Sequence, residues 1–400
     1  MVYSAILIAS VFLLLAFAVE RFSPLLGIPS VIVLVVLGFV AKPLMGLFGY
    51  TLVGLDVTVP IIGTIGLVLI VLEGALDIKL RRDRIRLAVT AFLTALIGFV
   101  VGVVIFSTTL YLGLSVSAVD ALLLSVPFAV ISSAVAISSS QFLPEEGREF
   151  VVYESSMSDI LGVLVFFAVL NSGGTLQGAL LGLIGGSTLS LVLSVVCSVG
   201  LVLVLMRIEG HIRFVPLLAG LFLLYSAGEL MHLSPLIMVL MFGLVLNNSK
   251  LLMRVGHLKH WVDDSFEDTL NEFKVLVLEL TFAVRGFFFI LLGYWTELSD
   301  LLAYQAWLAA AVVLAVIYGA RYVLFKLNRQ PDGRSLQWIA PRGLITVLLF
   351  LTAKEKLDLP SYLDGTVLIV VLASTALVTL ARLRLAQQKS PADDAMQATP

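Results

Sequence analysis

The sequence has little charge and almost no cysteine. Asp, Glu, Lys and Arg make up 13% of its 400 residues, about half the share that is usual in soluble proteins. The 25 Lys and Arg residues do not outnumber the 27 Asp and Glu residues, which excludes a nucleic-acid-binding role. Cys197 is the single cysteine, so a disulfide framework and a cysteine-ligated metal site are also excluded. No motif predicts a cofactor.

Hydrophobic residues are abundant instead. They make up 60% of the chain and the mean hydropathy is +1.08, which predicts an integral membrane protein. No basic segment precedes the first apolar run and no small-residue cleavage site follows it, so we expect a transmembrane span there and not a signal peptide.

The apolar runs predict an all-α polytopic protein. A bilayer core needs about 20 apolar residues per helix, and we divide the chain where Pro, Gly or clustered charges interrupt the runs. Thirteen spans result, over 2–20, 29–46, 60–76, 87–112, 118–140, 153–171, 176–206, 214–231, 234–247, 274–294, 299–325, 337–353 and 363–386.

Lys and Arg residues alternate between successive loops. With the N-terminus outside, the segments on the inner side hold 20 of the 25 basic residues, among them Arg321, and the outer loops hold Lys42, Lys354 and Lys356. Positive residues concentrate on the cytoplasmic side of membrane proteins. This distribution therefore predicts an outer N-terminus, a cytoplasmic C-terminus and a location in the cell (inner) membrane.

Other segments organise the predicted transmembrane domain, residues 1–388. Apolar residues recur every three or four positions over 250–273, which predicts an amphipathic helix on the cytoplasmic surface. Small residues repeat every fourth position in 176–206, which we expect to be a linker helix that packs closely on a neighbour. The polar composition of 389–400 is typical of a disordered cytoplasmic tail.

Ionisable residues inside the predicted spans are few. Asp159 lies in the sixth span, Arg285 in the tenth and Arg342 in the twelfth, whereas Glu73 and Glu154 lie nearer span ends. Each costs at least a few kcal/mol in a bilayer, so such residues are candidates for function. The alternative interpretation is that residues at span ends extend to the interface and central ones form structural ion pairs.

The sixth span combines a carboxylate with hydroxyl groups. Ser155 precedes Asp159 by four residues and so lies on the same helical face, while Ser158 adjoins Asp159 along the backbone. Oxygen ligands in a nearly dry setting are what an alkali cation requires. This pattern predicts a site for a monovalent cation.

Two spans carry interruptions. The fifth contains Pro127 and several serines, including Ser132 and Ser133, and the twelfth contains Pro341 followed by Arg342-Gly343. Paired interruptions in the two halves of a transporter predict broken helices at a midplane site, where freed carbonyls can bind cations. The two spans differ by seven in order and cross the membrane in opposite senses, which predicts inverted repeats over about 1–171 and 214–386.

Four patches in this order resemble the monovalent cation:proton antiporter superfamily, and its sodium/proton exchanger branch most closely. Residues 72–76 (LEGAL) are similar to the branch's Phe-Glu-Gly-Gly-Leu, and 132–137 (SSAVAI) to its Thr-Asp-Pro-Val-Ala-Val. Residues 154–159 (ESSMSD) are similar to Glu-Ser-Leu-Phe-Asn-Asp, and 342–343 match an Arg-Gly pair. With the span plan, the resemblance covers nearly the whole chain.

The resemblance implies a homodimer in which a mobile core domain holds two crossed broken helices and a scaffold domain makes the subunit contact. It also implies that Asp159 binds the proton and the cation in turn, that Glu154 pairs with Arg342, and that Arg285 can neutralise Asp159. The residues implied at the site are Asp159, Ser155, Ser158, Ser132 and Ser133 for the cation, with Glu154, Arg342, Arg285 and Glu73 as structural or modulating charges.

Three departures from the branch bear on the ion. Ser158 stands where the branch has Asn, Ser133 where it has Asp, and Ala134 where it has Pro. One central carboxylate favours electroneutral exchange of one cation for one proton. We therefore expect a Na⁺/H⁺ antiporter active in pH homeostasis, with Li⁺ or K⁺ as alternative ions at Asp159.

Other classes of protein fit less well. A carrier for an organic anion or another solute on the same broken-helix plan is the main alternative. A passive channel is disfavoured because the chain has no carbonyl-rich pore loop and no Arg-repeat voltage sensor. No hydrolase or protease motif is present, so an enzyme is not expected.

Overall fold

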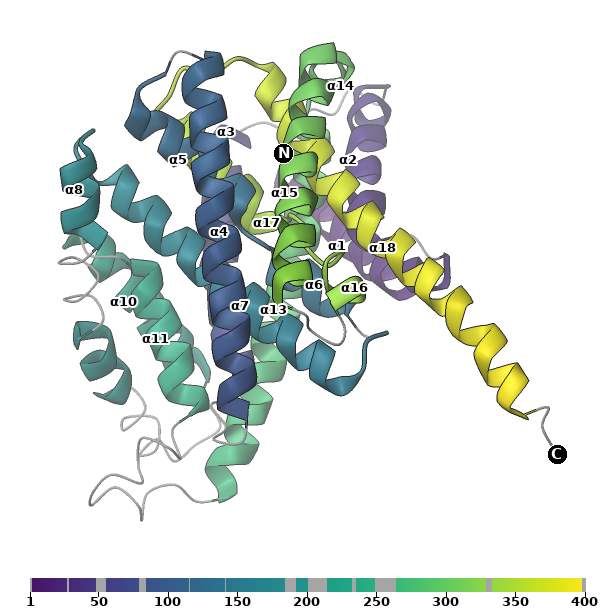
Figure 1. Cartoon of the computed structure of the whole chain (residues 1–400). Helices are drawn as coiled ribbons and strands as arrows, with labels where there is room; N and C mark the ends of the chain where they lie inside the picture. Colours follow the sequence, from purple (N-terminus) through teal and green to yellow (C-terminus); the bar gives the residue numbers. More distant parts are fainter. Residues whose placement is uncertain are drawn as a thin grey trace.

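The computed structural model is built of helices (Figure 1). It describes residues 2–26, 29–47, 55–78, 84–114, 116–140, 142–183, 192–200, 214–231, 235–248, 264–328 and 333–397. Within these ranges, eight helices are long and apolar enough to cross a membrane, and Phe214–Leu230, Pro235–Asn247 and Leu344–Lys354 are shorter apolar helices. The all-α polytopic class is thereby confirmed, whereas the number of thirteen spans stays a prediction.

The N-terminal half consists of long apolar helices and one broken helix. Its elements are α1 (Val2–Leu26), α2 (Ser30–Leu47), α3 (Leu55–Asp77), α4 (Ile85–Leu114), α5 (Ala118–Ala129), α6 (Ser133–Ser139), α7 (Glu145–Leu170) and α8 (Leu176–Leu181). Ser117 caps α5 because its hydroxyl accepts from the Asp120 N–H. Thr175 caps α8 in the same way through the Gly178 N–H.

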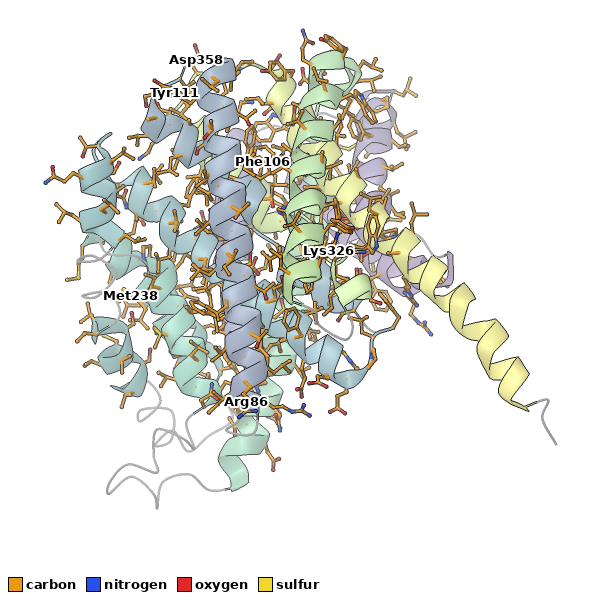
Figure 2. The ribbon with its side chains drawn as sticks, viewed as in Figure 1. Arg86, Phe106, Tyr111, Met238, Lys326 and Asp358 are labelled. Carbon is orange, nitrogen blue, oxygen red and sulfur yellow. The ribbon has the colours of Figure 1, made fainter. Side chains whose placement is uncertain are left out.

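The C-terminal half also contains long apolar helices and one broken helix. Its elements are α10 (Phe214–Leu230), α11 (Pro235–Asn247), α13 (Asp264–Trp295), α14 (Leu298–Leu302), α15 (Tyr304–Asn328), α16 (Gly333–Leu336), α17 (Leu344–Lys354) and α18 (Tyr362–Gln397). Arg86 near the start of α4 and Tyr111 near its end lie at opposite ends of the molecule (Figure 2). Asp358, after α17, lies at the Tyr111 end.

Both expected helix breaks are present, and they meet. Extended backbone at 130–132 separates α5 from α6, and residues 339–343 are non-helical before α17 begins. The Ser132 N–H donates to the Pro341 carbonyl (3.0 Å), so the two breaks contact each other. At Gly343 a Cβ atom would overlap the Ser132 side chain, and this close approach explains the glycine.

The helices form two groups. One group, α4, α5, α6, α7, α15, α17 and α18, packs mainly on itself around the two breaks, and we call it the crossed-helix group. The other, α1, α2, α3, α10, α11 and α13, also packs mainly on itself, and we call it the flanking group. Few contacts join the groups, and those near the breaks run from α6, α7 and α17 to α3 and from α7 to α11.

Three expected segments differ from the structure or lie partly outside it. Of the predicted surface helix, residues 250–263 lie outside the described residues, and from Asp264 onward the segment is continuous with the tenth span in α13. No proline or glycine separates the two parts, so nothing ends the helix. In 176–206, α8 and a helix over 192–200 are described.

The tail expected to be disordered is helical as far as Gln397. The structure continues α18 from the last span without a break. Residues 383–388 (LRLAQQ) are good helix formers, which lets an existing helix propagate beyond the span. The composition of 389–397, which includes Pro391 and two Asp residues, does not explain the helix there.

Candidate functional site

Asp159 lies in the middle of α7, against the break between α5 and α6. Its side chain is 7% exposed. One carboxylate oxygen, Oδ2, accepts a hydrogen bond from the Ser133 N–H at the start of α6 (3.2 Å). The other oxygen, Oδ1, is buried and has no hydrogen-bond partner among the described residues. The carboxylate is therefore held on one side and free to bind on the other.

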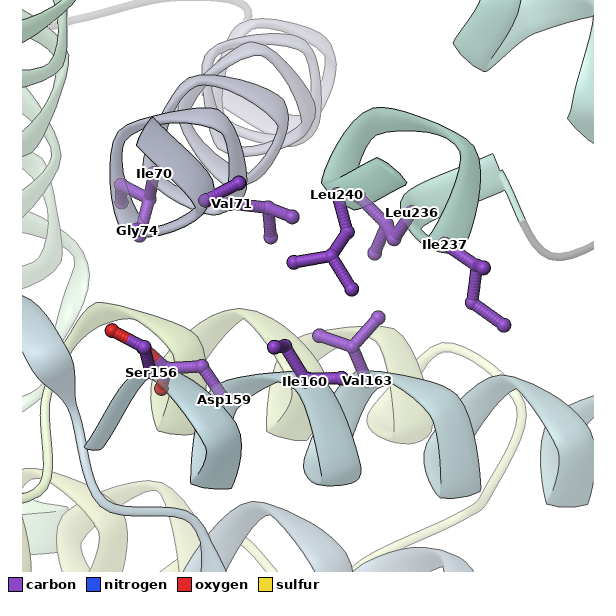
Figure 3. Close-up of a pocket in the computed structure, with 11 residues that line it drawn as sticks. Ile70, Val71, Gly74, Ser156, Asp159, Ile160, Val163, Leu236, Ile237 and Leu240 are labelled. Atoms are coloured by element: carbon purple, nitrogen blue, oxygen red, sulfur yellow. The ribbon is translucent and has the colours of Figure 1, made fainter. Parts of the chain in front are cut away.

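Asp159 lines a small cavity of about 20 Å³. Figure 3 shows Ser156, Asp159, Ile160 and Val163 of α7 on one wall, with side chains of α3 and α11 opposite. Apart from Ser156 and Asp159, the lining is Ile70, Val71, Gly74, Ala75, Ile160, Val163, Leu236, Ile237 and Leu240. A space of this size holds about one water molecule.

The four serines implied by the resemblance are all buried near the crossing. The Ser155 hydroxyl donates to the Val151 carbonyl (2.7 Å), and Ser158 Oγ accepts from the Ile131 N–H (2.9 Å). Ser158 thereby satisfies a backbone group that the break leaves without a helical partner. Ser132 and Ser133 use their N–H groups for Pro341 and Asp159, as described above.

Ser156 was not among the residues chosen from the sequence. It precedes Asp159 by three residues, so the spacing that pointed to Ser155 also puts Ser156 near the same face. The structure places Ser156, and not Ser155, on the cavity next to the free carboxylate oxygen.

Arg342 lies at the second break, and its side chain donates hydrogen bonds to the last carbonyl groups of α5. Its Nε donates to the Phe128 carbonyl (2.7 Å) and its Nη2 to the Ala129 carbonyl (3.4 Å). A cation is favourable at a helix C-terminus, where the last carbonyls have no helical partner. The positive charge of Arg342 also acts on Asp159.

Glu154 pairs with Arg321 and not with Arg342, so the expected pairing is wrong. Arg321 Nη1 lies 2.6 Å from Glu154 Oε1, and Arg321 Nη2 lies 3.2 Å from Oε2. Arg321 also donates to the Leu336 (2.8 Å) and Gln337 (3.2 Å) carbonyls. The Arg342 side chain instead donates to the carbonyls at the end of α5. Sequence reasoning missed Arg321 because its place at the end of a predicted span made it one of the inner basic residues.

Glu73 and Arg285 lie apart from the crossed-helix group, on α3 and α13. Both side chains are half-buried, and the Arg285 charge attracts the Glu73 carboxylate. Arg285 is thus near Glu73, and its expected role in neutralising Asp159 stays a prediction.

The sequence profile described as "Sodium/hydrogen exchanger, transmembrane" matches residues 7–383. The chain belongs to this family. Its members are transporters, so the protein is an integral membrane transporter and not an enzyme. A comparison with curated proteins gives no match.

Two solved structures have the same fold as this exchanger. One is the sodium proton antiporter MjNhaP1 from Methanocaldococcus jannaschii at pH 8, with a TM-score of 0.75 and 20% identity over 96% of this chain and 99% of that one. The other is an electron-microscopy structure of MjNhaP1, with a TM-score of 0.68 and 20% identity over 97% of each chain. The expected fold family is confirmed.

The exchanger also has a larger cavity, of about 500 Å³, nearer the end that carries the α7–α8 turn. It lies between α3, α10, α7 and α17, and its lining includes Tyr225 and Glu229. Phe167 and Leu67 border this cavity, whereas Val163 and Ile70, one turn away on the same helices, border the Asp159 cavity. One turn of apolar side chains therefore separates the two spaces.

Proposed function

We propose that the protein exchanges a monovalent alkali cation for H⁺ across the membrane, with Na⁺ as the first candidate and Li⁺ and K⁺ as alternatives. The observation that carries this proposal is the buried Asp159, which has one carboxylate oxygen without a partner among the described residues and lines a cavity with room for one water molecule. Membership of the sodium/hydrogen exchanger family supports the same function.

The proposed mechanism is competition for Asp159. An unneutralised carboxylate between apolar walls is unfavourable, so either a proton or a cation occupies Oδ1 while the Ser133 N–H holds Oδ2. Only the neutralised form moves between the two sides of the membrane. Exchange then follows without any contact between the two ions.

Alternating access is the motion that we propose for this exchange. The crossed-helix group would move as a core against the flanking group as a scaffold, which agrees with the few contacts between them. The single apolar turn between Asp159 and the 500 Å³ cavity would act as the barrier on that side. The inverted repeats over about 1–171 and 214–386 remain part of this proposal.

We propose an electroneutral stoichiometry of one cation for one proton. Among the described residues, Asp159 is the only carboxylate on its cavity, and Ser133 occupies the position of a second acidic residue in the related branch. Glu154 is held in a bidentate pair with Arg321 and does not line the cavity. Asp159, with oxygens of Ser132, Ser133, Ser155 and Ser158, is the proposed ligand set.

The setting of the exchanger is proposed from its sequence. The distribution of Lys and Arg supports an outer N-terminus, a cytoplasmic C-terminus and the inner membrane of the cell. A homodimer formed through the flanking group and a role in pH homeostasis complete the proposal.

The organic-anion alternative is less compatible with the site. Such a solute needs cationic or N–H donors in a space of its own size. The lining of the cavity at Asp159 has a carboxylate and a hydroxyl as its polar side chains, and its volume is about 20 Å³. A small cation fits these features.

Transport by proteoliposomes tests the proposal. An imposed pH gradient is followed by a fluorescent dye while Na⁺, Li⁺, K⁺ or choline is added, with and without a voltage clamp. We expect one or more alkali cations to dissipate the gradient equally well under both conditions. Asp159→Asn should abolish this exchange. The Asn amide is always neutral, so it cannot bind a proton and a cation in turn.

A matched control uses a carboxylate outside the site. Asp120, the partner of Ser117 at the exposed start of α5, is changed to Asn in the same way, and exchange should remain. Proton-coupled cation flux that survives in Asp159→Asn would refute the assignment. A response to organic anions and not to alkali cations would favour the alternative carrier.

A further inference from the structure

Ser156 is a buried serine of α7 that the proposed mechanism does not use. It is 2% exposed, and its hydroxyl has no hydrogen-bond partner among the described residues. Several other helical hydroxyls donate to a carbonyl in the preceding turn, as Ser155 does to Val151 and Ser125 does to Leu122. Ser198, Thr281 and Thr346 also lack a partner within the described ranges, but unlike Ser156 they do not line the cavity at Asp159. A buried polar group without a partner calls for an explanation, such as an ion or water that occupies the space beside it.

The space beside Ser156 is the cavity at Asp159. Ser156 Oγ and Asp159 Oδ1 are both buried, both lack partners, and both residues line this cavity from α7 (Figure 3). On the opposite wall, Gly74 lies close enough that a Cβ atom on it would be 4.0 Å from Ser156 Oγ. The rest of that wall is apolar, with Ile70 and Leu240 among its residues.

We propose that Ser156 is a ligand of the transported cation, which binds in this cavity between the Ser156 hydroxyl oxygen and Asp159 Oδ1. This inference rests on the proposed exchange function and adds a residue to its site. A hydroxyl oxygen is a neutral hard donor, and with the carboxylate it provides the ligands that a monovalent alkali cation prefers. Both ligands belong to α7. When α7 moves relative to α3 and α11, the ion can therefore move with α7 and keep both ligands.

The proposal separates the two ions that share Asp159. A cation needs several oxygen ligands, whereas a proton bonds to the carboxylate alone. Ser156→Ala should therefore raise the KM for the cation about tenfold or more, as expected for loss of a polar contact to a charged partner. The maximal rate and the factor by which H⁺ raises the KM between alkaline and neutral pH should stay close to wild type.

The experiment measures cation-dependent exchange in proteoliposomes for wild type, Ser156→Ala and Ser125→Ala. Ser125→Ala is the matched control, because it removes a buried hydroxyl that donates to a carbonyl and does not line the cavity. It should leave the KM within about twofold of wild type. Purified protein provides a second measurement, since a bound cation raises the melting temperature. Ser156→Ala should need about tenfold more Na⁺, Li⁺ or K⁺ for the same increase.

Two results would overturn the proposal. One is a KM and a cation-dependent melting shift within about twofold of wild type in Ser156→Ala. The other is a KM that rises equally in Ser125→Ala, which would mean that loss of any buried hydroxyl has this effect. Failure of the exchange function itself is recognised separately, by absence of cation-driven exchange in wild type or by its survival in Asp159→Asn.

Discussion

Glu154→Gln tests the buried ion pair that joins α7 to α15. The substitution preserves the shape of the side chain and removes its negative charge. Arg321 would then stay buried with the carbonyls of Leu336 and Gln337 as its remaining described acceptors. Because the two paired side chains are only 8% and 2% exposed, water does not replace the lost carboxylate. We therefore expect a large loss of stability.

The size of the loss follows from the burial of the pair. Two unit charges about 4 Å apart attract each other by about 4 kcal/mol at an effective dielectric constant of about 20. Removing one partner of a buried pair typically costs about 3–5 kcal/mol. With an unfolding entropy of about 2.1 cal/mol/K per residue over the 400-residue chain, this corresponds to a decrease in Tm of about 4–6 °C.

The assay is thermal unfolding of the purified protein, followed by tryptophan fluorescence. Glu149→Gln is the matched control on the same helix, since Glu149 pairs with Arg84 at 3.3 Å and both side chains are about 30% exposed. Because this pair is partly exposed, it should contribute less than the buried pair, about 1 kcal/mol, and the control should lower the Tm by about 1 °C. The double variant Glu154→Gln/Arg321→Gln should recover part of the loss, because it leaves no buried charge.

Two outcomes would refute this reasoning. If Glu154→Gln melts within about 1 °C of wild type, the pair is not buried as described. If a double-mutant cycle gives a larger coupling of Glu154 to Arg342 than to Arg321, the pairing in the structure is wrong.

Two further predictions concern the crossing and the loop at one end of the molecule. Gly343→Ala should lower the Tm and reduce exchange, because its Cβ would overlap the Ser132 side chain, and overpacking of this kind costs about 1–3 kcal/mol; wild-type melting would contradict it. Asp300 lies between α13 and α15, where burial and then the Asp364 and Glu297 carboxylates raise its pKa. A raised carboxyl pKa destabilises the folded state once the group ionises, so Asp300→Asn should melt above wild type at pH 8 and equally at pH values low enough to protonate the carboxyl. Melting curves across this pH range that coincide would refute the second prediction.

Local patterns predicted a large part of the fold. Apolar runs identified the membrane helices, because the bilayer demands a continuous apolar surface about 20 residues long. Pro341 and the serines around Ser132 identified both breaks, since these residues weaken or replace backbone hydrogen bonds. Asp159 was found for a related reason, as an ionisable residue in the middle of an apolar span.

The partners of the charged residues were harder to predict. Arg342 and Arg321 are both basic residues near Glu154 once the chain folds, and the sequence contains nothing that ranks them. Arg342 bonds to the carbonyls that end α5, so Arg321 is the residue left to pair with Glu154. Which arginine pairs with Glu154 therefore depends on where α5 ends and on which side chain reaches its last carbonyls. Both are properties of the packed structure.

The sequence by itself determined that this protein is a polytopic α-helical membrane protein with an ionisable residue and two helix breaks inside its spans. Those features depend on composition and spacing, which act locally along the chain. Only the tertiary structure decided that the breaks cross at Ser132 and Pro341, and that Ser156 lines the cavity at Asp159. Contacts between residues far apart in the chain depend on how the helices pack, and helical spacing gives a face without saying what lies opposite it.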